Sequence, residues 1–367
     1  MKMKNNNKGI TLVALVITII ILLILAGITI ASLTQTGLFA AAQDAKTKTE
    51  EKTEEENTIL EEYEDAITEQ VTGKKPLKPL ETNKKYESKA ELKDANGNKI
   101  VVPAGFKIVS DATTNNATTV DQGIVIEDAT GTDTNGSQFV WIPVGDIKKA
   151  DGTTTSIALN RYSFDSNGVA TEYTSTNFFE EDKTNTTSLK NYGNTISENI
   201  NSFKTSVATN GGFYIGRYEA RQNSSGKLTT VKTDSVWNSI TQPNTATNSK
   251  NMYSTGVTSE LMNSYAWDTA TLFLQTFGTQ SEKKYSKQNS LNTGFLAMTG
   301  TDIDKQCNVY DMASNVYEWT TETYNFYSPC VKRGGYYLSI DHYTSTRQSR
   351  GASESFTNVG FRPILYF

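Results

Sequence analysis

The sequence predicts an α+β protein in which a long N-terminal helix precedes a mixed domain of short strands and long loops. Residues 10–33 form an apolar run, and no charged residue lies between Lys8 and Asp44. Residues 40–70 are rich in Glu, whereas the rest of the chain is rich in Thr, Asn, Ser, Gly and Tyr. The acidic segment suits an exposed helix, and the second composition suits short strands joined by polar loops.

The apolar run is long enough to cross a membrane. A helix rises about 1.5 Å per residue, so about 20 apolar residues span the hydrocarbon core of a bilayer. We therefore predict a transmembrane helix over residues 10–34. Lys2, Lys4 and Lys8 lie on its N-terminal side, which keeps that end cytoplasmic and places the bulk of the chain outside the cell. The predicted protein is membrane-anchored and lies at the cell surface or on a pilus.

The short basic leader ends in Gly9 and leads directly into Ile10 and the apolar run. This junction resembles the type IV prepilin leader. The resemblance implies cleavage after Gly9 by a prepilin peptidase, methylation of Ile10 and assembly with other pilin-like subunits. Major pilins carry Glu at the fifth mature position, where this chain has Ala14. The difference favours a minor or tip subunit, or a protein that is simply anchored in the membrane.

The acidic segment continues the first helix outward. Leu60, Tyr63 and Ile67 recur at spacings of three and four residues, which gives a thin apolar stripe. Pro76 and Pro79 then favour an extended linker. The predicted organisation is a leader at 1–9, a transmembrane helix at 10–34, a stalk helix at 35–72, a linker at 73–85 and a globular head at 86–367.

Short apolar runs bounded by turn residues predict the elements of the head. One longer segment has apolar residues at helical spacing. Residues 153–210 are polar and predict loops with at most short helices. The predicted strands cover 100–103, 106–109, 123–127, 139–144 and 211–220, and the predicted helix covers 266–277.

Composition excludes several classes of function. Charged residues make up 20 % of the chain and the net charge is −5, so no basic surface for nucleic acid is expected. No nucleophile elbow, Walker loop or HExxH motif is present. The single histidine, His342, cannot build a multi-histidine metal site. Cys307 and Cys330 would permit one disulfide in an oxidising compartment, and their pairing stays open.

Six segments of the head occur in an order that points to one family. They are residues 139–144, 213–220, the helix around Trp267, and residues 309–320, 332–335 and 359–363. Together they resemble the formylglycine-generating enzyme (sulfatase-modifying factor) family. The resemblance implies a C-type-lectin-like fold. The family includes copper-dependent oxidases and non-enzymatic ligand binders, so the resemblance does not by itself imply an activity.

The oxidase activity depends on two cysteines that follow an Arg-Gly-Gly motif and ligate copper. The corresponding positions in this chain are Ser339 and Thr344. Neither side chain supplies the soft thiolate that holds Cu(I). We therefore predict a non-catalytic head without copper, and a divergent formylglycine-generating-type enzyme is the alternative.

The family resemblance also implies a Ca²⁺ site in the segment around Asn315 and Glu318. Amide, carboxylate and carbonyl oxygens are suitable ligands for this hard cation. The backbone carbonyls of Ser314 and Val316 would complete the set. A hydrogen-bonded turn without an ion is the alternative.

Two features of the C-terminal part concern the core. Arg362 follows the last Gly-Phe pair and could clamp a carboxylate such as Glu318 or Glu219, or else face solvent. Tyr317 and Trp319 alternate with other residues, which predicts one aromatic, buried face.

The loop after the Arg-Gly-Gly motif is the predicted binding surface. It combines rigid amphipathic rings with adaptable polar groups, as antibody paratopes do. We predict that the protein is a pilin-like, adhesin-type binder of an unknown extracellular ligand; the alternative is a structural minor pilin or pseudopilin of a type IV pilus or type II secretion system. The candidate ligand-binding residues are Tyr337, Ser339, Asp341, His342, Tyr343 and Arg347.

Overall fold

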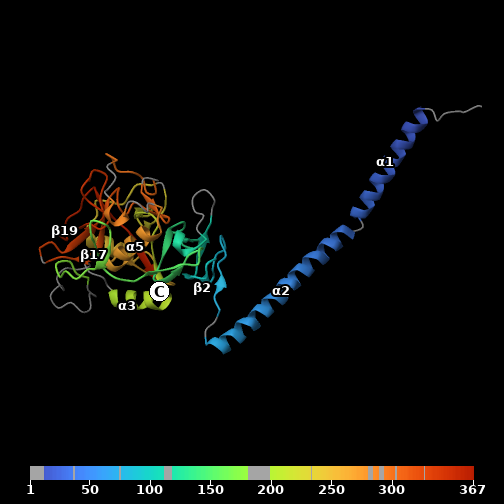
Figure 1. The fold of residues 1–367 in the computed structure, drawn as a ribbon. Helices are drawn as coiled ribbons and strands as arrows, with labels where there is room; N and C mark the ends of the chain where they lie inside the picture. Colours follow the sequence, from blue (N-terminus) through green and yellow to red (C-terminus); the bar gives the residue numbers. More distant parts are fainter. Residues whose placement is uncertain are drawn as a thin grey trace, which may run out of the picture. The chain divides into compact units, whose positions relative to one another are not determined.

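The computed structural model divides the chain into two compact units, Met1–Pro76 and Leu77–Phe367 (Figure 1). We call the second unit the head. Gly9 and Ile10, the predicted processing residues, lie outside the residues that the structure describes. Those residues are 12–35, 38–73, 76–110, 118–180, 199–232, 234–279, 284–288, 293–301, 304–325 and 327–367.

The first unit contains two helices, α1 (Leu12–Gln35) and α2 (Leu38–Thr72), and the sequence predicted a long helix weakly interrupted between these two ranges. The large apolar side chains of α1 between Leu15 and Leu25 are exposed. The transmembrane helix expected at 10–34 is not found, because no helix in the described part of the chain has the length and apolarity needed to span a membrane.

A six-stranded sheet forms the centre of the head. Its order is β14-β21-β11-β6-β5-β4, and every pairing in it is antiparallel. The sheet thus joins strands from both ends of the head sequence. Its strands are β4 (Phe106–Val109), β5 (Val125–Asp128), β6 (Gln138–Pro143), β11 (Gly212–Gly216), β14 (Thr258–Leu261) and β21 (Pro363–Tyr366).

Successive side chains of a strand point to opposite faces of a sheet, and in this sheet the side chains on both faces are buried. In β11, Tyr214 belongs to one hydrophobic cluster, whereas Phe213 and Ile215 belong to the other. Helices α3 (Ile200–Asn210) and α5 (Ser264–Phe277) contribute apolar residues to the second cluster. Helix α5 begins where the Asn263 side chain accepts a hydrogen bond from the Ala266 N–H at 2.8 Å.

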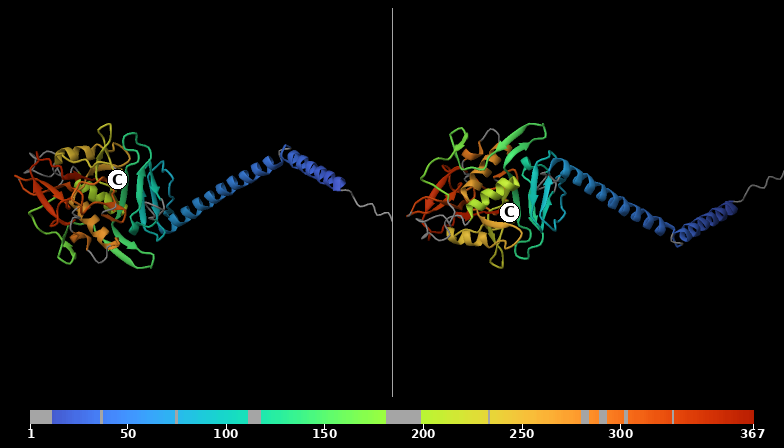
Figure 2. Two further views of the ribbon diagram at one scale, coloured as in Figure 1. Left: turned by 90° about the horizontal axis from the view of Figure 1, so that it is seen from above. Right: turned by 90° about the horizontal axis from the view of Figure 1, so that it is seen from below.

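A four-stranded sheet carries the C-terminal motifs, in the order β19-β18-β17-β20. Tyr317 and Trp319 in strand β17 are buried, which confirms the predicted aromatic, buried face. The opposite face of β17, which carries Glu318, is buried as well. Figures 1 and 2 show the C-terminal elements at one end of the head and the early strands at the other. The four strands are β17 (Tyr317–Thr323), β18 (Cys330–Arg333), β19 (Arg347–Arg350) and β20 (Val359–Phe361).

The head begins earlier than the sequence suggested. Strand β1 (Lys78–Pro79) pairs in parallel with β2 (Ala90–Lys93), which also pairs with β3 (Lys99–Val102), so part of the predicted linker 73–85 joins the head. The remaining elements are β7 (Gly145–Lys148), β8 (Thr154–Ile157), β9 (Tyr162–Phe164), β10 (Ala170–Glu172), β12 (Arg221–Gln222), β13 (Leu228–Thr229), β15 (Lys305–Gln306), β16 (Val309–Tyr310), α4 (Gln242–Lys250), η1 (Val120–Gln122) and η3 (Tyr285–Lys287).

Candidate functional site

Arg362 and Glu318 form a buried ion pair. Arg362, between β20 and β21, is fully buried and donates hydrogen bonds to both carboxylate oxygens of Glu318 at 2.7–3.2 Å. Its remaining N–H groups donate to the carbonyl oxygens of Gly216 and Tyr310, each at 2.7 Å. The predicted carboxylate clamp is confirmed for Glu318, and the alternative of a solvent-facing Arg362 is wrong. The guanidinium ties both sheets together through one set of directed bonds.

Further buried carboxyl groups surround this pair. Burial, followed by repulsion from Asp311 and Glu318, raises the pKa of Glu219 well above its ordinary value. Burial and the nearby Asp304 carboxyl raise the pKa of Asp311 in the same way. A protonated carboxyl group carries no charge, so these shifts limit the negative charge that Arg362 faces.

Asn315 is the residue that brings the surface loops together. Its backbone is in the left-handed conformation with φ at 60°, a region that Asn tolerates better than most residues. Its side-chain oxygen accepts a hydrogen bond from the Ala297 N–H at 2.9 Å, and its amide nitrogen donates to Glu219 at 2.6 Å. Its carbonyl oxygen accepts from the Tyr337 N–H at 2.9 Å. One residue therefore holds the loops at residues 297 and 337 beside each other.

The predicted calcium ligands do not fit a cation site. Glu318 already accepts from Arg362, so a divalent cation at this carboxylate would lie next to a guanidinium of like charge. Both ends of the Asn315 side chain are held by protein groups. Across the described residues, no group of three or more His, Cys, Asp or Glu side chains is arranged to hold a metal. A hydrogen-bonded turn describes the segment.

The predicted binding surface divides into exposed and buried residues. We define the binding loop as residues 336–343, which follow the Gly334-Gly335 pair. Asp341 and Tyr343 are exposed, and Tyr337 is half-buried. Ser339 is buried, and its N–H donates to the Tyr336 carbonyl at 2.9 Å. Tyr337, Asp341 and Tyr343 are thus at least partly exposed to solvent, and Ser339 points inward.

His342 holds the binding loop onto β17. Its Nδ1 lies 2.6 Å from the Tyr317 hydroxyl and 2.5 Å from the Ser339 hydroxyl, and its Nε2 lies 2.5 Å from the Gln348 amide. Burial, with the charge of Lys332, lowers the pKa of His342, which favours a neutral imidazole. His342 is thus a positioning residue for the loop.

Arg347 does not belong to the binding surface, which corrects the prediction. It is paired with Glu322 at 2.8 Å and with Asp268, and its side chain is almost entirely buried. Arg333 joins the same two carboxylates at 3.1 and 2.5 Å, and Arg161 also pairs with Glu322. An arginine held by two buried carboxylates has no freedom to contact a ligand.

A cleft of about 480 Å³ lies along a segment that the sequence analysis did not single out. Its lining residues come from residues 295–301, together with Lys232. The signal was present in the sequence, because Phe295, Leu296 and Met298 form an apolar cluster within a polar region. The side chains of Phe295, Leu296 and Met298 are exposed.

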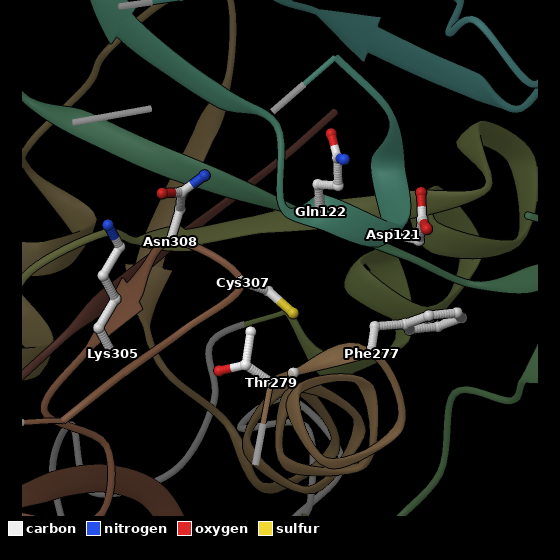
Figure 3. A pocket seen from close by; sticks show the side chains of 8 residues that line it. Asp121, Gln122, Phe277, Thr279, Lys305, Cys307 and Asn308 are labelled. Carbon is white, nitrogen blue, oxygen red and sulfur yellow. The ribbon is translucent and has the colours of Figure 1, made fainter. Parts of the chain in front are cut away.

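A second cleft of about 470 Å³ surrounds a cysteine (Figure 3). Burial raises the pKa of Cys307 to about 12, so its thiol stays protonated at neutral pH and is a poor nucleophile. Cys307 and Cys330 are both free thiols, which answers the question of their pairing. This cleft therefore offers no reactive group. It is lined by Asp121, Gln122, Phe277, Gly278, Thr279, Lys305, Cys307 and Asn308.

The C-terminal segment that holds Asn315, the binding loop and Arg362 has a recognisable family pattern. Residues 244–365 match the sulfatase-modifying factor enzyme 1-like domain. The matched segment runs from α4 into β21 and contains Asn315, the binding loop and Arg362, whereas Glu219 and Lys232 lie before it. The resemblance drawn from the sequence is confirmed for this part of the chain, and the head has a mixed α+β architecture.

Several solved structures are similar to this chain, CarF, PvdO and a major tropism determinant among them. The sequence matches no curated protein. The crystal structure of CarF has a TM-score of 0.30 and 12 % identity, and the match covers 42 % of this chain and 87 % of CarF. PvdO from Pseudomonas aeruginosa has a TM-score of 0.36 and 13 % identity, with 66 % and 98 % covered. The major tropism determinant M1 variant has a TM-score of 0.25 and 11 % identity, with 77 % and 82 % covered.

Proposed function

We propose that the head is a non-catalytic ligand-binding domain and that the binding loop is its contact surface. The main support for the proposal is a division of roles within this loop: some of its side chains hold the loop in place, and others are exposed to a ligand. Ser339 and His342 fix the loop through a part-buried hydrogen bond, whereas Asp341 and Tyr343 face solvent. A loop that is already ordered loses little conformational entropy when a ligand binds.

The residues at the metal-binding positions of the family's oxidases support a non-catalytic role. Ser339 is engaged with His342, and the Thr344 hydroxyl donates to the Tyr285 carbonyl at 2.8 Å. Hydroxyls in place of thiolates do not hold Cu(I). The same two residues therefore serve the structure of the loop rather than redox chemistry.

The test of the binding surface is a screen of the full-length protein in detergent against a glycan array and a phage-displayed peptide library. We expect Tyr337→Ala, Asp341→Ala and Tyr343→Ala each to weaken binding of the selected ligand by at least about tenfold, because interface aromatic and charged residues dominate binding energy. Tyr327→Ala is the control, because Tyr327 is 87 % exposed and lies outside the loop. Selected ligands that bind all three variants normally would contradict the proposal.

We also propose that the N-terminal segment anchors and displays the head outside the cell after prepilin-type processing. The support is the sequence alone: the uncharged stretch between Lys8 and Asp44 and the Gly9–Ile10 junction. We expect mass spectrometry of the surface-exposed protein to find an N-methylated Ile10 as the first residue. Gly9→Val is the control, because it removes the cleavage site. A wild-type chain that begins at Met1 would contradict this part of the proposal.

A further inference from the structure

Five exposed apolar side chains lie on the binding loop and on the segment that is hydrogen-bonded to it. Phe295 and Met298 are 61 % and 56 % exposed, and Leu338 and Ile340 are 50 % and 60 % exposed. Leu296 completes the group, and we call these five residues the apolar patch. Single exposed apolar residues are ordinary on a protein surface, whereas a cluster marks a site of interaction.

Hydrogen bonds hold the two halves of the patch next to each other. The Gly294 N–H donates to the Tyr337 carbonyl at 3.1 Å, which joins the segment before Phe295 to the segment before Leu338. Asn315 binds both segments, through Ala297 on one side and Tyr337 on the other. The two segments that carry the patch are therefore neighbours in the fold, although they are about forty residues apart in the sequence.

The segment that carries the first half of the patch is rigidly held. The Thr299 hydroxyl donates to the Val231 carbonyl at 2.8 Å, and the Thr299 N–H donates to the Asp234 carbonyl at 2.8 Å. Gly300 has a φ of 70°, and a Cβ at this position would lie 2.5 Å from the Tyr218 ring. Such an ordered apolar surface is ready to bind without first folding.

The cleft within the patch has a defined chemical character. Among the described residues that line it, Lys232 is the charged one, and the other lining side chains are mainly apolar. Lys232 is exposed, and its ammonium lies 5.8 Å from the Tyr310 ring centre. A cation at the rim of an apolar cleft favours a ligand that combines an apolar group with a nearby anion.

We propose that this patch is a docking site for a protein segment that inserts a large apolar side chain into the cleft and places an Asp or Glu beside Lys232. The inference rests on the proposed function and names its ligand class. A glycan would need polar side chains that converge on its hydroxyls. Among the described lining residues of this cleft, Thr301 and Lys232 have polar side chains. Phe, Leu and Met are instead the residues that form adaptable protein-binding surfaces.

The test selects a phage-displayed peptide library on the full-length protein in detergent. We expect the selected peptides to carry a Phe, Leu, Met or Trp next to an acidic residue. The double variant Phe295→Ser with Met298→Ser should weaken their binding at least tenfold. Lys232→Glu should weaken binding of the acidic peptides and remove most of its salt dependence. Val169→Ser is the matched control, because Val169 is also 56 % exposed and lies outside the patch.

The outcomes separate this inference from the proposed function. Failure to enrich any peptide, or selected peptides that bind the patch variants normally, would overturn the inference. If Tyr343→Ala abolishes binding of a ligand that the Phe295 and Met298 double variant still binds, the proposed role of the binding loop stands and the inference about the apolar patch is wrong. A patch variant that changes only the oligomeric state, measured by sedimentation, would assign the surface to a second copy of this chain and overturn the inference as well.

Discussion

Replacement of Arg362 by Ala is expected to lower the free energy of unfolding of the head by about 3–5 kcal/mol, the usual cost of removing one partner of a buried ion pair. Arg362 is fully buried, and its loss leaves Glu318 buried without its cation. It also leaves the carbonyl groups of Gly216 and Tyr310 without their donor. Chemical denaturation of the full-length protein in detergent, followed by tryptophan fluorescence, measures the change.

Two further variants define the cause of this loss. Lys84→Ala removes an exposed, solvent-screened ion pair with Glu81 and should leave stability nearly unchanged. The double variant Arg362→Met with Glu318→Met should recover part of the loss, because it removes the unpaired charge together with its partner. A double variant no more stable than Arg362→Ala alone would contradict the view that the uncompensated charge causes the loss.

The second large effect concerns pH: the head is expected to be more stable at pH 5 than at pH 7. Burial raises the pKa of Glu180 to about 7 and that of Asp304 to about 6. The folded state therefore keeps these protons at a pH where the unfolded chain has lost them. Stability then falls as pH rises from the unfolded values near 4 through the folded values. Each group contributes about 3 kcal/mol to this fall, at 1.36 kcal/mol per pKa unit.

A separate group limits stability at lower pH. Burial by itself would raise the pKa of Glu322. The guanidinium groups of Arg347 and Arg333 outweigh this effect and lower the pKa of Glu322 to about 2. The ion pairs of Glu322 contribute fully to stability above a pH of about 4.5, the pKa of Glu in the unfolded chain. This contribution is lost as the pH falls toward 2. His342, whose pKa is lowered, opposes the trend below pH 6.5 with one smaller contribution. The expected maximum therefore lies at about pH 4, near the unfolded carboxyl values, where the gain from Glu180 and Asp304 is nearly complete and the loss from Glu322 begins.

Denaturation curves at half-unit pH steps test the whole profile. Glu180→Gln and Asp304→Asn should each flatten the fall between pH 5 and 7, because neither amide titrates there. Each amide keeps an oxygen for the bonds that the carboxyl accepts from Ser264 and Ala313 respectively. Glu172→Gln is the control, since Glu172 is exposed. A profile that rises steadily from pH 5 to 7 would show that these carboxyl groups are not held protonated.

Local sequence pattern was sufficient for the elements of the head. The predicted helix at 266–277 and the strand at 106–109 are present because each depends on apolar spacing within a few residues. The exposed cluster around Phe295 was missed because an apolar run in a loop has no period that separates core from surface. Burial on both faces of β17 was missed for a related reason, since it depends on elements packed from elsewhere.

Residue chemistry alone did not locate every side chain of the site. Arg347 looked like a ligand-binding residue because it lies near exposed tyrosines in the sequence. Its partner Asp268 is 79 residues away, and only the fold brings the two together. Glu318 was one of two carboxylates considered for Arg362, and the other, Glu219, accepts from Asn315 instead. Local patterns fix which groups are available, whereas long-range packing decides which pairs form.

The position of β21 has a consequence for the synthesis of the head. This strand, Pro363–Tyr366, lies inside the six-stranded sheet between β14 and β11. Until it arrives, β11 and β14 have no common neighbour, and Arg362 cannot reach Glu318. We expect the head to stay open on the ribosome until residue 366 has emerged and then to close in one cooperative step. Chaperones that act during translation therefore meet this head with its sheet unfinished.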